Sequence, residues 1–216
     1  MRARFTVSDI AATALEIVDR DGLGGLSMRT LASALETGPM TLYNYVADRA
    51  GLEELVAEAV IADVKVPEPA DNWHDDVRAI AMQMWETMRR HPNAVPLVLT
   101  RRTVSASSYL AADRLIAALG RAGLADMDLL AGFRAVLGLV MGSAQGELAG
   151  PLAGSEREHE QIAVAARIGG LARAEHSHVA ALAHTSEQST AAADFDRGLD
   201  ILLAGIESLG RRADRR

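Results

Sequence analysis

The sequence predicts an all-α protein: an N-terminal three-helix domain with a helix-turn-helix, then a larger C-terminal helical bundle, about nine to ten helices in total. Apolar residues recur at helical spacing along most of the 216 residues. Aromatic residues make up only 4%, so the core must be built mainly from Ala, Leu, Val, Ile and Met, a set that favours helices. Apart from Pro39, the six prolines fall where such helices would begin or end.

Two helices at the N-terminus follow from caps and apolar stripes. Ser8 is expected to cap the first helix, which ends near Asp21-Gly22. Its inward residues are Ile10, Ala14, Ile17 and Val18. After a glycine-rich turn, Ser27 is expected to cap the second helix. Its inward residues are Met28, Leu31, Ala32 and Leu35.

A tight turn and a third helix complete the motif. In the turn Glu36-Thr37-Gly38, Gly38 is expected to supply backbone angles that other residues resist. Pro39 then begins the third helix, because its missing N–H needs no partner in a first turn. Leu42 and Val46 should bury against the second helix. The outward residues are Met40, Thr41, Tyr43 and Asn44. In a helix-turn-helix, such a second helix of the pair enters the DNA major groove.

The outward face of the third helix has chemistry that suits DNA. Thr41 offers a methyl and a hydroxyl, Asn44 an amide that fits adenine, and Tyr43 a phenol that can reach a phosphate. Residues 38–40 offer few hydrogen-bond donors, so base readout there would depend on apolar contact and DNA shape. The alternative is that the tyrosines complete a small core, above all Tyr45, which projects only partly outward.

A longer helix is predicted from Asp48 to about Val64, with an unbroken apolar stripe between 52 and 60. Pro67 and Pro69 stop it, which places the domain boundary at 66–71. The chain therefore divides into a helix-turn-helix domain at 1–47, a connecting helix at 48–65 and a second domain at 66–216. The connecting helix is the link through which one domain could reposition the other.

The second domain is predicted to consist of successive amphipathic helices. One begins at Trp73 and ends at His91-Pro92, and a short element at 94–101 follows it. A helix from about 104 to 122 is capped by Gly123. The next helix, from Asp126 to about Leu148, is apolar nearly all round. Its Gly138 and Gly142 lie one turn apart and would let another helix approach closely.

The remaining C-terminal part contains a loop at 150–154, an alanine-rich stretch at 156–183 that is predicted to be helical, and a clear last helix closed by Gly210. That last helix presents one apolar stripe. Its residues are Phe195, Leu199, Leu202, Leu203, Ile206 and Leu209.

Composition and charge exclude several classes of protein. There are no cysteines, which excludes disulfides and thiolate metal sites and fits a reducing cytoplasm. No N-terminal signal peptide is found, and the most apolar window, 129–144, contains Arg134 and falls short of a membrane span. The net charge of −7 argues against a nucleic-acid partner, but residues 1–50 hold five Arg against six acidic residues, so most of the acidity lies elsewhere. Arg2 and Arg4 form either a frayed terminus or an arm that contacts DNA.

No enzyme chemistry is predicted. The six histidines include no H-E-x-x-H spacing, and no serine lies in a G-x-S-x-G turn. We therefore expect neither a catalytic site nor a cofactor or metal.

The run Thr41-Leu42-Tyr43-Asn44-Tyr45-Val46, followed by Asp48-Arg49 and by Leu52 to Leu55, resembles the DNA-binding domain of the TetR family of bacterial transcriptional repressors. The resemblance implies DNA contacts from Thr41, Tyr43, Tyr45 and Arg49, with Arg29 as a further candidate. Gly38, Pro39 and Met40 lie where family members vary their base-reading side chains.

The second domain resembles the C-terminal domain of the tetracycline-repressor-like branch of this family. The similar pieces are Asn72-Trp73, Arg90-His91-Pro92, Ala122-Gly123-Leu124 and Phe195 to Asp200, in the same order. This resemblance implies a regulatory domain that binds a small molecule and dimerises through its late helices. Where tetracycline-binding members place a magnesium-liganding histidine, around Val98, this chain has apolar residues, so a metal–tetracycline complex is not the expected effector.

Residues for these two roles follow from side-chain chemistry and position. Candidates for a ligand cavity are Met82, Met84, Trp85, Met88, Thr100, Phe133, Met141 and Gln145, although a methionine stripe is also typical of plain core. Candidates for the dimer interface are Phe133, Gly138, Gly142, Phe195, Leu199, Leu202 and Ile206.

The sequence as a whole predicts a cytoplasmic, homodimeric repressor that binds a double-stranded operator and releases it when a small molecule occupies the C-terminal domain. The acidic charge keeps one alternative open, an all-α small-molecule-binding or structural dimer that does not read DNA.

Overall fold

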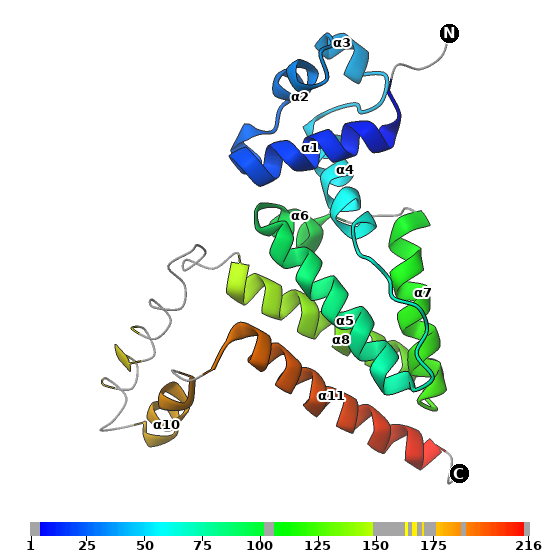
Figure 1. Ribbon diagram of the computed structural model, residues 1–216, viewed down its shortest axis with the longest axis vertical. Helices are drawn as coiled ribbons and strands as arrows, with labels where there is room; N and C mark the ends of the chain where they lie inside the picture. The colour runs from blue at the N-terminus through cyan, green and yellow to red at the C-terminus, as the bar shows by residue number, and fades with distance from the viewer. Residues whose placement is uncertain are drawn as a thin grey trace.

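The computed structural model describes residues 5–101, 106–148, 176–186 and 189–213, with 163, 166, 167 and 170. In this part of the chain ten α-helices (α1–α8, α10 and α11) and two 3-10 helices form an elongated molecule without strands, which confirms the all-α prediction (Figure 1). We call α1 to α3 the head and α5 to α11 the body. Helix α4 joins them.

The head and the joining helix contain five elements. They are α1 (Val7–Asp21), η1 (Leu23–Gly25), α2 (Met28–Ala34), α3 (Pro39–Leu42) and α4 (Arg49–Ala62). The cap of α1 differs from the prediction, because Thr6 rather than Ser8 precedes the helix and forms a reciprocal capping box with Asp9. Helix α4 begins one residue after the predicted start at Asp48, and Asp48 caps it, since its Oδ1 accepts the Gly51 N–H at 3.0 Å.

The body contains seven described elements. They are α5 (Trp73–Arg90), η2 (Pro92–Ala94), α6 (Val95–Thr100), α7 (Ala106–Arg121), α8 (Asp126–Leu148), α10 (Ser177–Ser186) and α11 (Ala191–Ala213). The predicted loop at 150–154 and most of the predicted helix at 156–183 lie outside the described residues. Where they are described, the body helices agree closely with the predicted ranges.

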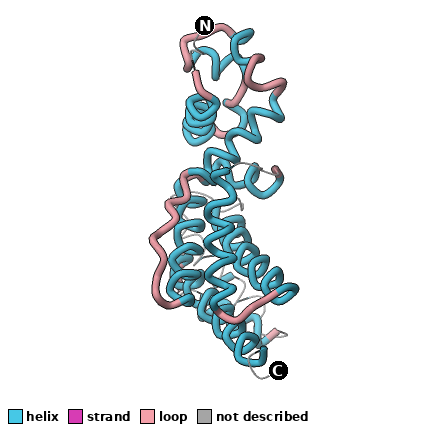
Figure 2. The backbone as a smooth tube through the Cα atoms, turned by 90° about the vertical axis from the view of Figure 1, so that its right-hand side faces the viewer, coloured by secondary structure: helices cyan, strands magenta, loops and turns pink. Residues whose placement is uncertain are grey.

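The path of the chain brings the far end of α5 back to the head. After α4, the segment 63–72 runs along the body without helical structure, and α5 then returns toward the head (Figures 1 and 2). Its last residues therefore lie beside α1 and the end of α4. The head and the C-terminus lie at opposite ends of the molecule (Figure 2).

One continuous core runs through head and body. Ile10, Leu31 and Leu42 are fully buried in the head, as is Leu52 on α4, and the body core includes Trp85, Leu115, Val136 and Phe195. Burial of each such side chain stabilises the fold by about 1.5–3 kcal/mol.

Two glycines bring α7 and α11 together. Gly123 adopts a φ of 84° after α7, which supports the predicted glycine cap. Gly210 was predicted to end the last helix, but α11 continues to Ala213. A Cβ at Gly210 would lie 1.9 Å from the Ala122 carbonyl oxygen, so this glycine permits close helix contact rather than a stop.

Candidate nucleic-acid interface

The helix-turn-helix begins with a well-formed cap on α2. The Ser27 hydroxyl accepts the Thr30 N–H at 3.1 Å, and the Thr30 hydroxyl accepts the Ser27 N–H at 2.9 Å. The predicted cap is confirmed, and Leu31 and Ala32 are buried as predicted. The orientation of α2 is thus fixed by local hydrogen bonds and by its apolar face.

The turn between α2 and α3 uses a different residue from the one predicted. Glu36 takes the left-handed conformation with a φ of 50°, whereas Gly38 has an ordinary φ of −84° and precedes α3 as its cap residue. The Thr37 N–H donates to the Ala32 carbonyl at 2.9 Å and closes the end of α2. The conformational argument for Gly38 is therefore wrong, and a Cβ there would meet no atom within 4 Å.

Helix α3 is anchored on one side and open on the other. Pro39 occupies its first turn, and Leu42 and Val46 are buried against the head core, as predicted. Met40 is 77% exposed and Tyr43 is 49% exposed. Asn44 is also exposed, and Thr41 is half-buried. The four predicted outward residues thus form one solvent-facing surface.

Tyr45 is held by the head itself. Its hydroxyl donates to the Phe5 carbonyl at 3.1 Å, and its ring packs against the core. This placement favours the alternative in which Tyr45 completes the small core of the head.

Arg49 is also engaged within the chain. Its Nε donates to Oε1 of Glu53 at 3.0 Å and its Nη2 to the Leu23 carbonyl at 3.0 Å. Arg101, directly after α6, donates to the other oxygen of Glu53. The Arg49 hydrogen bond, more than burial, sets the pKa of Glu53, and with Arg101 it keeps that pKa below the ordinary value. A chain of ion pairs thus joins the body to the start of α4.

The charge near α3 is sparse. Residues 38–46 include no charged side chain, so the nearest cations in sequence are Arg29 and Arg49. Arg29 is exposed on α2, and the described part of the chain gives its guanidinium no hydrogen bond or ion pair. Arg2 and Arg4, the proposed arm, lie outside the described residues.

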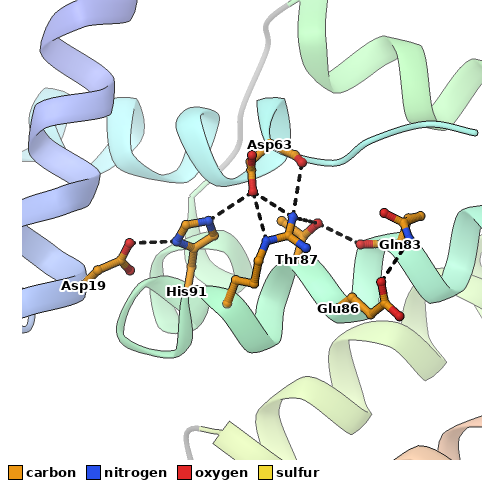
Figure 3. A network of polar contacts seen from close by, with 7 residues as sticks. Asp19, Asp63, Gln83, Glu86, Thr87 and His91 are labelled. Carbon is orange, nitrogen blue, oxygen red and sulfur yellow. Dashed lines mark hydrogen bonds and ion pairs between the residues drawn. The ribbon is translucent and has the colours of Figure 1, made fainter.

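A polar network joins the head, α4 and the end of α5 (Figure 3). Nδ1 of His91 lies 2.8 Å from Oδ2 of Asp19, and its Nε2 lies 3.3 Å from Oδ2 of Asp63. Arg90 donates to the same Asp63 oxygen at 2.7 Å. Burial would raise the pKa of Asp63, but the hydrogen bonds from Arg90 and His91 outweigh it and keep this pKa below its ordinary value.

Sequence reasoning missed the role of this junction. His91 was identified only as part of a helix stop, and its partner Asp19 lies 72 positions away. The amide of Asn93 adds two hydrogen bonds to the end of α1, to the carbonyls of Val18 and Asp19. No local pattern relates such distant residues, so only the fold reveals that they meet.

The candidate ligand residues do not all share one environment. Met84, Trp85 and Met88 are buried on the inward face of α5, while Phe133 and Met141 on α8 are half-buried. Met82 lies two positions from Met84 and so faces another side of the helix. Thr100 and Gln145 are exposed, and the Thr100 hydroxyl donates to the Pro96 carbonyl at 2.7 Å.

Trp85 is the most unusual of these residues. Its ring is 1% exposed and stacks on Phe195 with centroids 4.7 Å apart and an interplanar angle of 5°. The guanidinium of Arg89 lies 4.8 Å from its ring centroid. Among the residues that the structure describes, its buried Nε1 finds no hydrogen-bond partner. A buried N–H without a partner costs about 1–3 kcal/mol, so this group calls for an acceptor.

The predicted dimer residues fall into two groups. Phe195, Leu199 and Ile206 are buried within the single chain, because α11 packs against α8 through them. Leu202 and Phe133 are half-buried. Gly138 and Gly142 are exposed, and a Cβ at either would meet no atom within 4 Å. The single chain thus covers Phe195, Leu199 and Ile206 of the α11 stripe, and the dimer interface itself stays a prediction.

Helix α8 has more apolar surface than the described residues cover. Its segment Asp126–Gly146 is long and apolar enough, by length and composition alone, to span a membrane, so the expectation that this stretch falls short of that length is not met, yet only 22% of its most apolar window is buried. Exposed apolar residues include Met127 and Leu130 on α8 and Ile201 and Leu209 on α11.

Two further clusters of charge lie within the body. The buried Asp76 pairs with Arg114 at 3.2 Å and with Arg121 at 2.5 Å, and Arg78 pairs with Asp196 and Asp200 of α11. Within the described residues, no group of three or more His, Asp or Glu is arranged to hold a metal ion.

Comparison with known families and proteins places this fold among regulators. Residues 66–209 match the family described as Tetracyclin repressor-like, C-terminal domain. An HTH-type transcriptional regulator of Saccharopolyspora erythraea is 30% identical over 205 residues, covering 94% of this chain and 84% of that protein. The HTH-type transcriptional repressor DrrR1 of Streptomyces coeruleorubidus is 30% identical over 148 residues, covering 67% of this chain and 54% of the relative. Both are regulators rather than enzymes.

Solved structures agree over nearly the whole length. Apo ActR from Streptomyces coelicolor superimposes with a TM-score of 0.83 at 25% identity, covering 99% of this chain and 100% of ActR. ActR in complex with actinorhodin gives a TM-score of 0.80 at 27% identity, covering 95% and 96%.

Proposed function

The chain belongs to the TetR family of helix-turn-helix transcriptional regulators, and we propose which of its parts carry that function. The exposed face of α3 reads operator DNA, and a small molecule held among α5, α8 and α11 releases it. Residues 1–47 form the DNA-binding domain, 48–65 the connecting helix, and 66–216 the ligand-binding and dimerisation domain. The regulator works in the cytoplasm, where bacterial DNA lies.

The observation that carries the DNA-reading role is the division of α3 into two faces. Leu42 and Val46 are buried and fix the helix on the head. The opposite face is therefore open to solvent, and it carries Met40, Thr41, Tyr43 and Asn44. A rigid helix with a free polar and aromatic face is what the major groove accepts. Gly38 and Pro39 lead into this face, and Arg29 supplies a free cation for a phosphate. Tyr45 and Arg49 stabilise the position of this helix through their hydrogen bonds to the Phe5 carbonyl and to Glu53 and the Leu23 carbonyl.

The effector is a molecule with an aromatic surface and a hydrogen-bond acceptor. The unpartnered Nε1 of Trp85 supports this, because an acceptor oxygen beside it would satisfy a buried donor. The methionines of the same face, Met84 and Met88, adapt to flat apolar rings. ActR, a relative with the same fold, has been solved with actinorhodin bound. Native mass spectrometry of the purified protein would detect such a retained molecule.

The functional unit is a homodimer formed by α8 and α11. Gly138 and Gly142 on α8 and Ile201 and Leu209 on α11 are small or apolar residues that the described part of the chain leaves exposed. A second copy would cover them and would also present two α3 helices to successive major grooves, about 34 Å apart. A ligand that favours another separation of the two heads weakens DNA binding by its differential affinity for the two states.

The signal from the body reaches the head at two places. Arg101 and Glu53 connect the end of α6 to α4, and His91 and Asp63 connect the end of α5 to α1 and α4. Both connections meet on α4, so a shift of the body helices is transmitted to the helix that carries the head.

The test is a gel shift with the double variant T41A/Y43A. Each side chain makes a contact worth about 1–3 kcal/mol, so operator affinity should fall at least about tenfold without loss of stability. The matched control is Tyr109→Ala, which removes an equally exposed tyrosine from α7. Unchanged affinity of the double variant would refute the assignment of this face and would favour the acidic dimer that does not read DNA.

A further inference from the structure

A groove of about 640 Å³ lies between α1 and α4, on the side where the head meets the body. One wall is formed by residues of α1 and the other by residues of α4 and its end. Arg90 and His91, at the end of α5, also line the groove. None of the candidate effector residues on α5, α8 or α11 lines it. Its volume lies in the range of small-molecule sites, about 300–1,000 Å³.

The lining of the groove is apolar between the two helices. Leu15 and Leu55 are its large apolar residues and are only 7% and 8% exposed. Ala11, Ala12, Ala59 and Ala62 line the walls. Small alanines on two facing helices leave room for a flat ring.

The rim of the groove carries an excess of negative charge. Four carboxylates line it, those of Glu16, Asp19, Glu58 and Asp63, against two basic side chains. Both basic groups are already engaged, because Arg90 pairs with Asp63 at 2.7 Å and His91 bridges Asp19 and Asp63.

Three acceptor groups in the groove lack a hydrogen-bond donor. Within the described residues, neither Glu16 nor Glu58 has a hydrogen bond or an ion pair, although Glu16 interacts electrostatically with Arg20. Oδ1 of Asp19 is buried and has no hydrogen-bond partner, although its other oxygen meets His91. A buried acceptor without a donor is costly, so the Asp19 carboxylate adds to the preference of the rim for a positive charge.

From this geometry we infer a second binding site, distinct from the effector site, for a small organic cation with an aromatic body. The ring lies on the alanines and leucines of the lining. The ammonium group lies among the carboxylates of Glu16, Glu58 and Asp19. Charge complementarity selects a cation over a neutral molecule of the same shape.

The test uses 1-naphthylmethylamine, which is protonated at neutral pH, and its neutral isostere 1-naphthalenemethanol, in calorimetric titrations of the full-length protein. We expect the amine to bind once per protomer, about tenfold more tightly than the alcohol. The variant E16Q/E58Q should remove this preference. Ala12→Trp, at an exposed position on the groove wall, should abolish binding by filling the groove.

Glu54→Gln is the matched control, because Glu54 is an exposed carboxylate of α4 that does not line the groove. Thermal melts of all variants establish that they fold. Absence of amine binding at millimolar concentration, equal affinity for amine and alcohol, or unchanged binding in either groove variant would each overturn the inference. Because these substitutions leave α3, α8 and α11 intact, such a failure leaves operator binding untouched.

Discussion

At the helix starts of the head and of α4, capping hydrogen bonds join residues three positions apart, as in Thr6 with Asp9, Ser27 with Thr30 and Asp48 with Gly51. In the body, ion pairs between helices join residues 38 to 122 positions apart, as in Asp76 with Arg114 and Arg78 with Asp200. The helix starts near the head are therefore set by local contacts, whereas these body helices are joined by contacts that exist only when distant parts of the chain have folded together.

This difference separates the effects of mutation in the two regions. The outward face of α3 contributes little to the packing of the head, so changes there should alter DNA binding and leave stability intact. In the body, the carboxylate of Asp76 is buried between helices, so its removal should alter stability first. The following predictions test this separation, beginning with the largest effect.

Asp76→Ala should cost about 3 kcal/mol of unfolding free energy. The carboxylate is buried and pairs with both Arg114 and Arg121, so its removal leaves two guanidinium groups without their partner between α5 and α7. Urea unfolding measures the loss. Asp75→Ala is the matched control, because Asp75 is the exposed neighbour in the same first turn and should cost less than about 1 kcal/mol. Equal costs for the two variants would contradict the role of the long-range pairs.

Gly138→Arg should weaken dimerisation by about 2 kcal/mol, because it places two like charges on the uncovered face of α8. Sedimentation velocity over a range of concentrations measures this change. Gly120→Arg makes the same substitution at an exposed glycine of α7, where a Cβ also meets open space, and should leave the dimer intact. If Gly138→Arg stays as dimeric as the control, the proposed interface lies elsewhere.

The same separation explains how far the sequence could be interpreted. The cap at Ser27, the start of α3 at Pro39 and the range of α8 were all predicted, because each depends on neighbouring residues. The junction of His91 with Asp19 could not be predicted, since nothing in the sequence relates positions so far apart.

Apolar stripes show the same limit. A stripe such as Phe195, Leu199 and Ile206 predicts that a helix face is buried, but not whether its own chain or a second copy covers it. Here the protomer itself covers these residues, and Phe195 stacks on Trp85. Which partner buries a helix face depends on the tertiary arrangement, and the spacing of apolar residues in the sequence does not specify that arrangement.

The turn of the head provides a smaller test of local structure. Glu36 has the left-handed backbone and Gly38 does not, so Glu36→Gly should raise stability by about 1 kcal/mol. Gly38→Ala should change stability by less than about 0.5 kcal/mol, because its φ is ordinary and the space around it is open. Thermal unfolding of both variants decides the matter. A large loss from Gly38→Ala would show that the glycine is needed for the backbone after all.

The smallest predicted effect is on the loss of stability at acidic pH. The folded chain lowers the pKa of Glu53 below its ordinary value of 4.5, chiefly through the Arg49 hydrogen bond. Its contribution to stability is therefore complete above pH 4.5 and is lost as the pH falls through the folded pKa. Glu53→Gln should remove about 0.5 kcal/mol at neutral pH and flatten the acid dependence, whereas Glu54→Gln should change neither. Urea unfolding at several pH values measures this. An equal acid dependence in Glu53→Gln and in the wild type would contradict the pairing.

The most direct test of the account is selection of bound sequences from a random pool of DNA duplexes with the full-length protein. The account predicts enrichment of one pseudo-palindromic sequence, whose half-sites are spaced by about one helical turn to fit two α3 helices. It also predicts that T41A/Y43A fails to enrich that sequence while Tyr109→Ala still does. Recovery of no common sequence by the wild-type protein, or of the same sequence by T41A/Y43A, would contradict the claim that this face reads DNA.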